Sequence, residues 1–158
     1  MRTLTLHRET SLDRSAFLAR LSDAALWDSL GSRARLERLD ADTRVEVTTP
    51  MSASDLPEAL ASRLPSSAEL VEVYILPGDI VGASTEVRMT AHAAGVPVEI
   101  DALITLIDRD ASGTGAGTAV DVRAEISSSV PLFGSMIESA VAPVLEKKLG
   151  QRLATFAA

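Results

Sequence analysis

Acidic residues open a glycine-rich stretch, DRDASGTGAGTA, that spans residues 108–119. The first, third, fifth and sixth positions of a calcium-binding loop are matched here by Asp108, Asp110, Ser112 and Gly113. The twelfth position is Ala119, where such a loop needs a bidentate glutamate. The flanking residues alternate as strands do, so we expect a β-hairpin loop and no calcium site. GTGAG is followed by neither a lysine nor a helix start, so it does not predict a phosphate site.

Histidine, serine and cysteine, which carry most metal and nucleophile chemistry, offer little in this sequence. The two histidines, His7 and His92, fall on polar strand faces without obvious carboxylate companions, which makes a metal site a weak interpretation. No GxSxG segment occurs, so a hydrolase triad has little support. The absence of cysteine excludes disulfides and thiolate sites. We therefore predict no catalytic residue, no metal and no cofactor.

Acid–base chemistry in a pocket needs a positioned acid or base. Tyr74, the one tyrosine, is a candidate, but it alternates with apolar residues and the pattern does not decide which side faces the interior. The expected inner faces of the later strands offer Ser128 and neither a carboxylate nor a histidine. This absence favours a non-catalytic function over an enzyme.

The candidate residues must be positioned by the surrounding elements, chiefly three long segments in which polar and apolar residues alternate as in strands. Each has one dry and one wet face, as in an antiparallel sheet that is open to water on one side. The dry faces of residues 83–93, 96–108 and 117–130 carry Val87, Met89, Ala91, Ala93, Val96, Val98, Ile100, Ala102, Ile104, Leu106, Val120, Val122, Ala124, Ile126, Ser128 and Val130. The wet faces carry a lattice of surface charges that includes Glu99, Asp101, Asp121, Arg123 and Glu125. Shorter strands are expected at 2–8, 33–39, 42–49 and 69–76.

Helices are expected before, between and after these strands. Thr10 or Ser11 can cap a first helix, a second spans 23–30, and Leu56, Leu60 and Leu64 predict a short one within 50–65. The chain ends in a helix over about 131–156, with an apolar stripe formed by Leu132, Phe133, Met136, Ile137, Ala140, Val141, Val144, Leu145, Leu149, Leu153 and Phe156. Pro143 removes a backbone hydrogen bond to Ser139. Because the stripe continues across it, we expect one kinked helix rather than two.

Composition limits the class of protein. A length of 158 residues with 46% hydrophobic residues predicts one domain, residues 1–158. A net charge of -7 and 3% aromatic residues argue against a nucleic-acid partner. The N-terminus lacks the apolar run of a signal peptide, and no segment approaches the roughly 20 apolar residues that span a bilayer. We expect a soluble cytoplasmic protein without an integral membrane segment, as a monomer or homodimer.

The order strand, two helices, about six strands and long helix resembles the helix-grip fold of the START-like superfamily, also called SRPBCC or birch-pollen-allergen-like. TPMSASDLPEAL, AGVPVEIDALITL and SVPLFGSMIE also resemble an actinobacterial branch of unknown function. The resemblance covers most of the chain. It implies an α+β fold: one curved antiparallel sheet of six to seven strands around a long C-terminal helix, with two short helices after the first strand.

The resemblance also implies a cavity between sheet and helix for a small hydrophobic ligand, such as a lipid or a polyketide-like molecule. Residues expected to line it are Trp27, Val87, Met89, Ala91, Ile100, Ala102, Ile104, Val122, Ala124, Ile126, Met136, Ala140 and Val144. Four of these are alanines, whose small side chains leave space. Trp27 could instead anchor the core, and larger side chains could fill the interior. Non-catalytic binding is the leading hypothesis; a cyclase- or dehydratase-type enzyme and a filled scaffold that acts through its surface are the alternatives.

Overall fold

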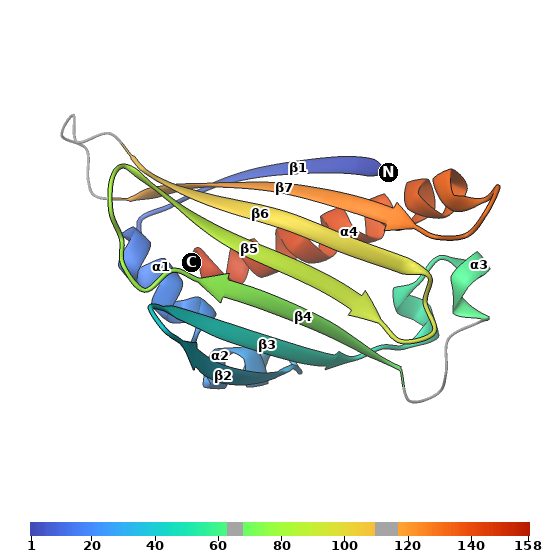
Figure 1. Ribbon diagram of the computed structural model, residues 1–158, viewed down its shortest axis with the longest axis horizontal. Helices are drawn as coiled ribbons and strands as arrows, with labels where there is room; N and C mark the ends of the chain where they lie inside the picture. Colours follow the sequence, from blue (N-terminus) through green and yellow to red (C-terminus); the bar gives the residue numbers. More distant parts are fainter. Residues whose placement is uncertain (63–67, 110–116) are drawn as a thin grey trace.

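The computed structural model describes residues 1–62, 68–109 and 117–158. Within them, seven strands form one antiparallel sheet in the order β1-β7-β6-β5-β4-β3-β2 (Figure 1). The strands are β1 (Arg2–Thr10), β2 (Arg33–Leu39), β3 (Asp42–Pro50), β4 (Glu69–Leu76), β5 (Ser84–Ala93), β6 (Val98–Asp108) and β7 (Thr118–Ser128). The helices are α1 (Arg14–Leu21), α2 (Ala24–Ser29), the 3-10 turn η1 (Ala53–Asp55), α3 (Glu58–Ala61) and α4 (Gly134–Phe156).

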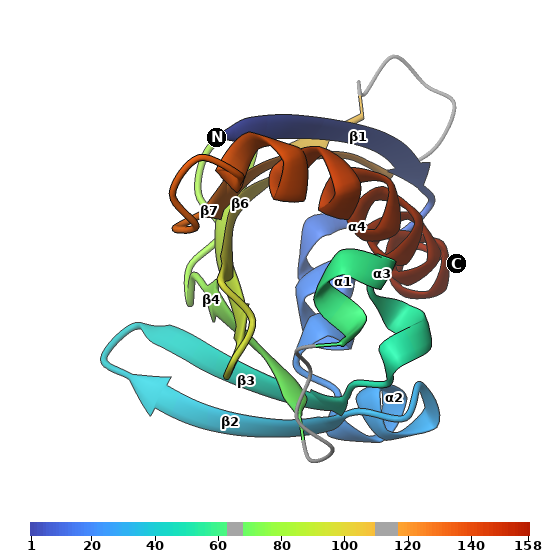
Figure 2. The same ribbon diagram turned by 90° about the vertical axis from the view of Figure 1, so that its right-hand side faces the viewer.

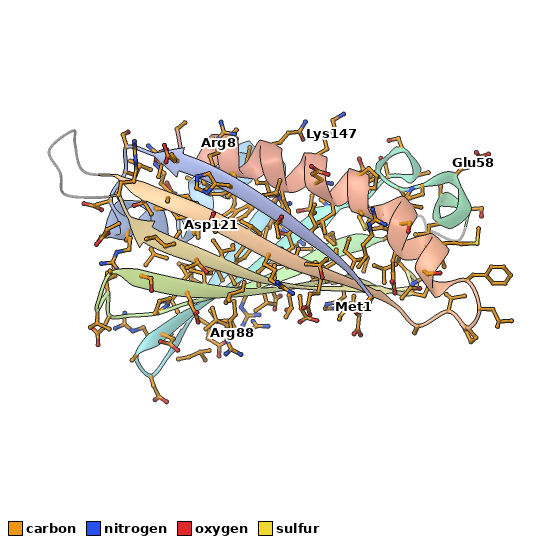
Figure 3. All side chains as sticks on the ribbon, turned by 90° about the horizontal axis from the view of Figure 1, so that it is seen from above. Met1, Arg8, Glu58, Arg88, Asp121 and Lys147 are labelled. Carbon is orange, nitrogen blue, oxygen red and sulfur yellow. The ribbon has the colours of Figure 1, made fainter. Side chains whose placement is uncertain are left out.

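The sheet is strongly curved, and all the helices lie on its concave side. Viewed along the long axis of the molecule, it runs from β1 through β7, β6 and β4 down to β3 and β2, with α4 across its upper part (Figure 2). Arg88, on the convex side, and Lys147, on the outer side of α4, point away from each other (Figure 3). The expected α+β helix-grip arrangement, with two short helices after the first strand and a long C-terminal helix, is confirmed.

Alternation of side chains explains the three long strands. Along β5, β6 and most of β7, every second residue is buried, and these residues are the ones assigned to the dry faces from the sequence. The register places them in cross-strand rows, such as Ala124, Ala102 and Met89. A turn at residues 94–95 follows β5, where Gly95 takes a φ of 82° that L-amino acids rarely adopt.

The N-terminal helices begin at aspartates. The side chain of Asp13 accepts a hydrogen bond from the N–H of Ala16 at 2.7 Å, so the expectation that Thr10 or Ser11 caps α1 is wrong. Thr10 is needed elsewhere: it is buried, and its hydroxyl donates to the Ala157 carbonyl at 2.6 Å. Asp23 caps α2 in the same manner as Asp13 caps α1. Of the short helix expected within 50–65, the structure shows η1 and α3, while Leu64 lies outside the described residues.

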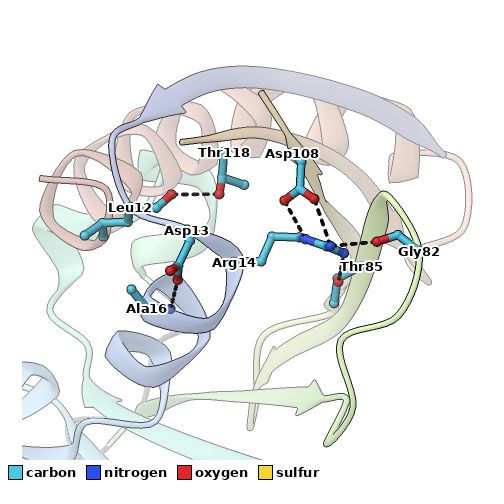
Figure 4. Close-up of polar contacts among 8 residues, drawn as sticks. All are labelled: Leu12, Asp13, Arg14, Ala16, Gly82, Thr85, Asp108 and Thr118. Atoms are coloured by element: carbon cyan, nitrogen blue, oxygen red, sulfur yellow. Dashed lines mark hydrogen bonds and ion pairs between the residues drawn. The ribbon is translucent and has the colours of Figure 1, made fainter. Parts of the chain in front are cut away.

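Arg14, at the start of α1, fastens this helix to the sheet. Its guanidinium donates to both carboxylate oxygens of Asp108 at 2.8 and 2.9 Å, to the Thr85 hydroxyl at 2.9 Å and to the Gly82 carbonyl at 2.6 Å (Figure 4). The paired Arg–carboxylate hydrogen bonds fix both distance and orientation. Asp108 therefore holds a helix in place. Of the stretch in which calcium ligands were considered, residues 110–116 lie outside the described residues.

Helix α4 runs without interruption through Pro143, so the prediction of one helix is confirmed. Pro143 and Ser139 are both exposed, so the helical hydrogen bond that the proline cannot donate is lost on the outer side of the helix. Neither α4 nor any other helix in the described ranges is long and apolar enough to cross a membrane.

Candidate binding site between the sheet and helix α4

A buried polar group lies between the middle of the sheet and the C-terminal half of α4. Strand β4 turns Glu72, Tyr74 and Leu76 toward the concave side, because side chains two residues apart share a face. Glu72 is 1% exposed and Tyr74 is 3% exposed. Helix α4 adds Arg152, whose side chain is 13% exposed. We call Glu72, Tyr74 and Arg152 the polar triad.

The two donors of the polar triad converge on one oxygen atom. The Tyr74 hydroxyl donates to Oε2 of Glu72 at 2.6 Å, and Nη1 of Arg152 donates to the same Oε2. The other oxygen, Oε1, is buried and has no hydrogen-bond partner among the described residues. Buried polar atoms almost always have a partner, so this oxygen marks a place where a donor is missing.

The electrostatics of the triad shift the pKa values of Tyr74 and Arg152. Burial, and next the charge of Glu72, raise the pKa of Tyr74 well above its usual value, so its phenol remains a neutral donor. Burial alone would lower the pKa of Arg152, but the charges and hydrogen bonds of Glu72 and Tyr74 together outweigh burial and raise that pKa. Arg152 therefore stays positively charged and compensates the carboxylate inside the protein.

Trp27 packs against Arg152, one member of the polar triad. The indole is fully buried, and its Nε1 donates to the Leu21 carbonyl at 2.8 Å. Its ring lies 4.5 Å from that of Phe156 and 5.6 Å from that of Tyr74, centroid to centroid. The Arg152 guanidinium lies 5.3 Å from the indole centroid, within the range of a cation–π interaction. Trp27 is thus a core anchor and does not lie at a cavity mouth.

Two hollows meet at Arg152. Inside the protein, a cavity of about 30 Å³ has an almost entirely apolar lining that includes Trp27, Tyr74, Met89 and Arg152. Outside, a groove of about 380 Å³ runs along α4 and also includes Arg152 in its wall. The rest of the groove comes from the α2–β2 connection, the end of β3, η1 and α4, through Leu30, Gly31, Ser32, Thr49, Pro50, Asp55, Lys148, Gln151 and Thr155.

The sheet brings most of the expected lining residues to the triad. Ala91 is the register partner of Glu72, and Met89 is the partner of Tyr74. Ala102 follows Met89 across the next pair of strands. The predicted residues that are buried on this concave side are Trp27, Val87, Met89, Ala91, Ile100, Ala102, Ile104, Val122, Ala124 and Ile126. The alanines therefore form a low floor that leads to the polar triad.

The predicted inner face of α4 is wrong in its first half. Met136 is 67% exposed, Ala140 is also exposed and Val144 is half-buried. Of the expected stripe in this half only Val141 is buried, and the other buried positions are Glu138 and Ala142. Glu138 can face inward because it accepts a hydrogen bond from the Ser128 N–H at 3.0 Å and pairs with the Met1 ammonium at 2.6 Å. A hydrophobic pattern predicts that a glutamate such as Glu138 faces water. The sequence therefore placed the buried face of this part of α4 at Met136.

Sequence reasoning named Tyr74 as a possible acid or donor without deciding which side it faces, and it missed Glu72 and Arg152. The expectation about carboxylates concerned the inner faces of the later strands, whereas Glu72 lies inside on β4, so this buried carboxylate was not foreseen. Strand β4 is ambiguous, since Val71, Val73 and Ile75 on its other face fit a core equally well, yet they are half-buried on the convex side. Arg152 had a signal that was not used: it lies three residues after Leu149 and four before Phe156, on the buried stripe of α4.

The other candidate residues lie on the convex surface. Nδ1 of His7 lies 2.5 Å from Oδ1 of Asp121, both more than 40% exposed. His92 is exposed on β5. In the wet-face lattice, Arg123 approaches Glu125 at 3.9 Å. Among residues 1–62, 68–109 and 117–158, no three His, Cys, Asp or Glu side chains are grouped so as to hold a metal ion.

Residues 6–157 match the family model described as protein of unknown function (DUF2505). The chain belongs to the DUF2505 family. A comparison of the sequence with curated proteins found no match.

Solved structures share the fold of this DUF2505 member at low sequence identity. The crystal structure of TTHA0849 from Thermus thermophilus is 12% identical, with a TM-score of 0.59 over 99% of this chain and 94% of that one. A conserved protein from Geobacillus kaustophilus is 9% identical, with a TM-score of 0.55 over 98% of this chain and 90% of that one. These similarities concern the fold alone.

Proposed function

We propose that this DUF2505 protein binds a small, largely hydrophobic molecule between the concave side of the sheet and α4. The observation that carries the proposal is the floor of small residues that ends at a buried carboxylate oxygen without a partner among the described residues. Ligand sites are typically apolar with a few placed polar groups, and this arrangement has both parts. The resemblance to START-like proteins supports the same location for a ligand.

The end of the sheet beside η1 and α3 is the less tightly closed part of the interior. Leu70, Ile137 and Leu145, which pack against the core, are half-buried. Water therefore reaches apolar side chains that a ligand could cover, and their burial would favour binding.

Binding requires side chains to move at the triad. A cavity of about 30 Å³ is close to the volume of one water molecule, whereas ligand pockets typically measure about 300–1,000 Å³. Met89 and Arg152 line the cavity and have long, flexible side chains. Arg152 also lines the outer groove, so its displacement would join the two hollows.

The experiment is a binding titration with a naphthalene-based fluorescent probe, with thermal unfolding in parallel. Ala102→Leu fills the floor and should abolish saturable binding while the fold survives. Thr90→Leu adds similar apolar bulk on the exposed face of β5 and should leave binding unchanged. If neither the probe nor a lipid extract binds saturably or shifts the melting temperature of the wild-type protein, the binding proposal is wrong.

An enzyme of cyclase or dehydratase type is the second candidate, and Glu72 is the observation that favours it. An enclosed carboxylate with a free oxygen can act as a general base, and the neutral Tyr74 phenol can donate a hydrogen bond. Mass spectrometry of molecules that co-purify with the wild-type protein and with Glu72→Gln would separate the two functions. The same molecule in both samples indicates binding alone, whereas a substrate that accumulates only in the variant indicates catalysis.

A further inference from the structure

We infer that the ligand carries an uncharged hydrogen-bond donor, such as a hydroxyl group, which Oε1 of Glu72 accepts. This inference rests on the proposed binding function and specifies the chemical class of the ligand: an apolar skeleton with one neutral donor group.

The first step is the state of the carboxylate. Both protein donors, from Tyr74 and Arg152, are directed at Oε2, and Oε1 has no partner among the described residues. Glu72 is 1% exposed, so bulk water does not solvate this oxygen. A ligand that brings a donor gains a hydrogen bond at an atom whose desolvation has already occurred during folding.

The second step is the charge balance. The Glu72 carboxylate and the Arg152 guanidinium already compensate each other within the buried group. An ammonium ligand would add an unpaired positive charge to the interior, and burying an unpaired charge is costly. A carboxylate ligand would place its lone pairs against those of Oε1. A neutral donor avoids both penalties.

The third step is the shape next to Oε1. Ala91, which is 4% exposed, pairs with Glu72 in the β4–β5 register, and Ile100 pairs with Ala91 on β6. The surface beside the carboxylate is therefore low and apolar on the side away from Val47, the β3 partner of Glu72. The donor group must be attached to a hydrophobic body that lies along β5 and β6.

The test compares four ligands that share a naphthalene ring and differ in one group: naphthalenemethanol, naphthalene carboxylate, naphthylmethylammonium and methylnaphthalene. The affinity of the full chain for each is measured by fluorescence titration at neutral pH. We expect the alcohol to bind about ten-fold more tightly than the other three, which corresponds to one net hydrogen bond. Ala91→Leu should remove this binding, and Thr90→Leu, the neighbouring exposed position, should retain it.

Glu72→Gln gives a second and sharper readout. The two donors hold the amide oxygen at the Oε2 position, so the amide N–H₂ group takes the place of Oε1. The variant should therefore prefer naphthaldehyde, which can only accept a hydrogen bond, over methylnaphthalene by about ten-fold, a preference that the wild-type protein lacks. Tyr74→Phe leaves Oε1 unaltered and should keep the preference for the alcohol.

The outcomes distinguish this inference from the proposed function. If the four ligands bind with equal affinity, or a charged one binds best, the donor inference is wrong and hydrophobic binding stands. If Glu72→Gln does not acquire the preference for the aldehyde, Oε1 is occupied by water alone and the inference is also wrong. If no naphthalene ligand binds the wild-type protein, the proposed function fails and this inference fails with it.

Discussion

The two ends of the concave side are closed to different degrees. At the end that carries α1, α2 and the C-terminus, Phe17, Trp27 and Phe156 are 1%, 0% and 2% exposed, and we call this the sealed end. At the end beside η1 and α3, Leu70, Ile137 and Leu145 are half-buried, and we call this the loose end. The views across and along the long axis of the molecule show that α1 and α2 lie at the first end and α3 at the second (Figures 1 and 2).

This difference indicates that one end of the fold mainly provides stability and that the other end can serve ligand binding. Large aromatic side chains and the Arg14 contacts hold the sealed end together. The loose end has alanines on the sheet and the partly exposed first half of α4 above them. The polar triad lies between the two ends. We therefore expect substitutions at the sealed end to reduce stability and substitutions at the loose end to affect ligands.

The largest contrast is expected between Trp27→Ala and Leu145→Ala. Removal of the buried indole leaves a large cavity and should cost about 3–5 kcal/mol of unfolding free energy. Leu145 is half-buried, so its truncation should cost about 1 kcal/mol. Urea unfolding followed by circular dichroism measures both. Equal losses for the two variants would contradict the distinction between the ends.

The triad should show the cost of an unpaired buried charge. Arg152→Met removes the partner of Glu72 and should destabilise the fold by about 3–5 kcal/mol. The triple variant Glu72→Leu, Tyr74→Phe, Arg152→Met replaces the whole group with apolar side chains and should regain most of that loss. Both values come from urea unfolding at neutral pH. If the triple variant is less stable than Arg152→Met, the triad stabilises the fold beyond its internal charge compensation.

A finer test of the same distinction uses two alanines that lie opposite each other on the adjacent strands β6 and β7. Ala124 is fully buried on β7, between β1 and β6 in the sheet, so Ala124→Leu should overpack the core and cost about 1–3 kcal/mol. Ala102, on the adjacent strand, is 8% exposed, and Ala102→Leu should cost less than about 1 kcal/mol. Differential scanning calorimetry compares the two. A greater loss of stability for Ala102→Leu than for Ala124→Leu would mean that the free space lies beside Ala124 and not beside Ala102.

The smallest effect is expected outside the concave side, at His7. Its hydrogen bond to Asp121 raises the pKa of His7 above the usual 6.5 despite the opposing effect of burial. The stabilisation is therefore fully present below about pH 6.5 and is lost as the pH rises through the folded-state pKa. Because both side chains are largely exposed, the effect should be small. Urea midpoints between about pH 6 and pH 8 should fall more for the wild-type protein than for His7→Gln.

Local patterns in the sequence were sufficient for the sheet and for the ends of most elements. The strands expected at 33–39 and 69–76 have the observed bounds, because a period of two together with glycine and proline turns leaves little freedom. The same reasoning placed Ala91, Ala102 and Ala124 on one face of the sheet. A single helix through Pro143 was also predictable, since the apolar spacing on either side of the proline stays in phase.

Tertiary structure decided which faces became interior where polar and apolar residues were balanced. In β4 both faces fit a core, and Glu72 lies inside because Arg152, 80 residues later in the chain, supplies the compensating charge. In α4 the buried Glu138 depends on the N–H of Ser128 and the ammonium of Met1. A sequence pattern treats each charge alone and assigns it to water. Only the folded chain brings distant partners close enough to offset the cost of desolvation.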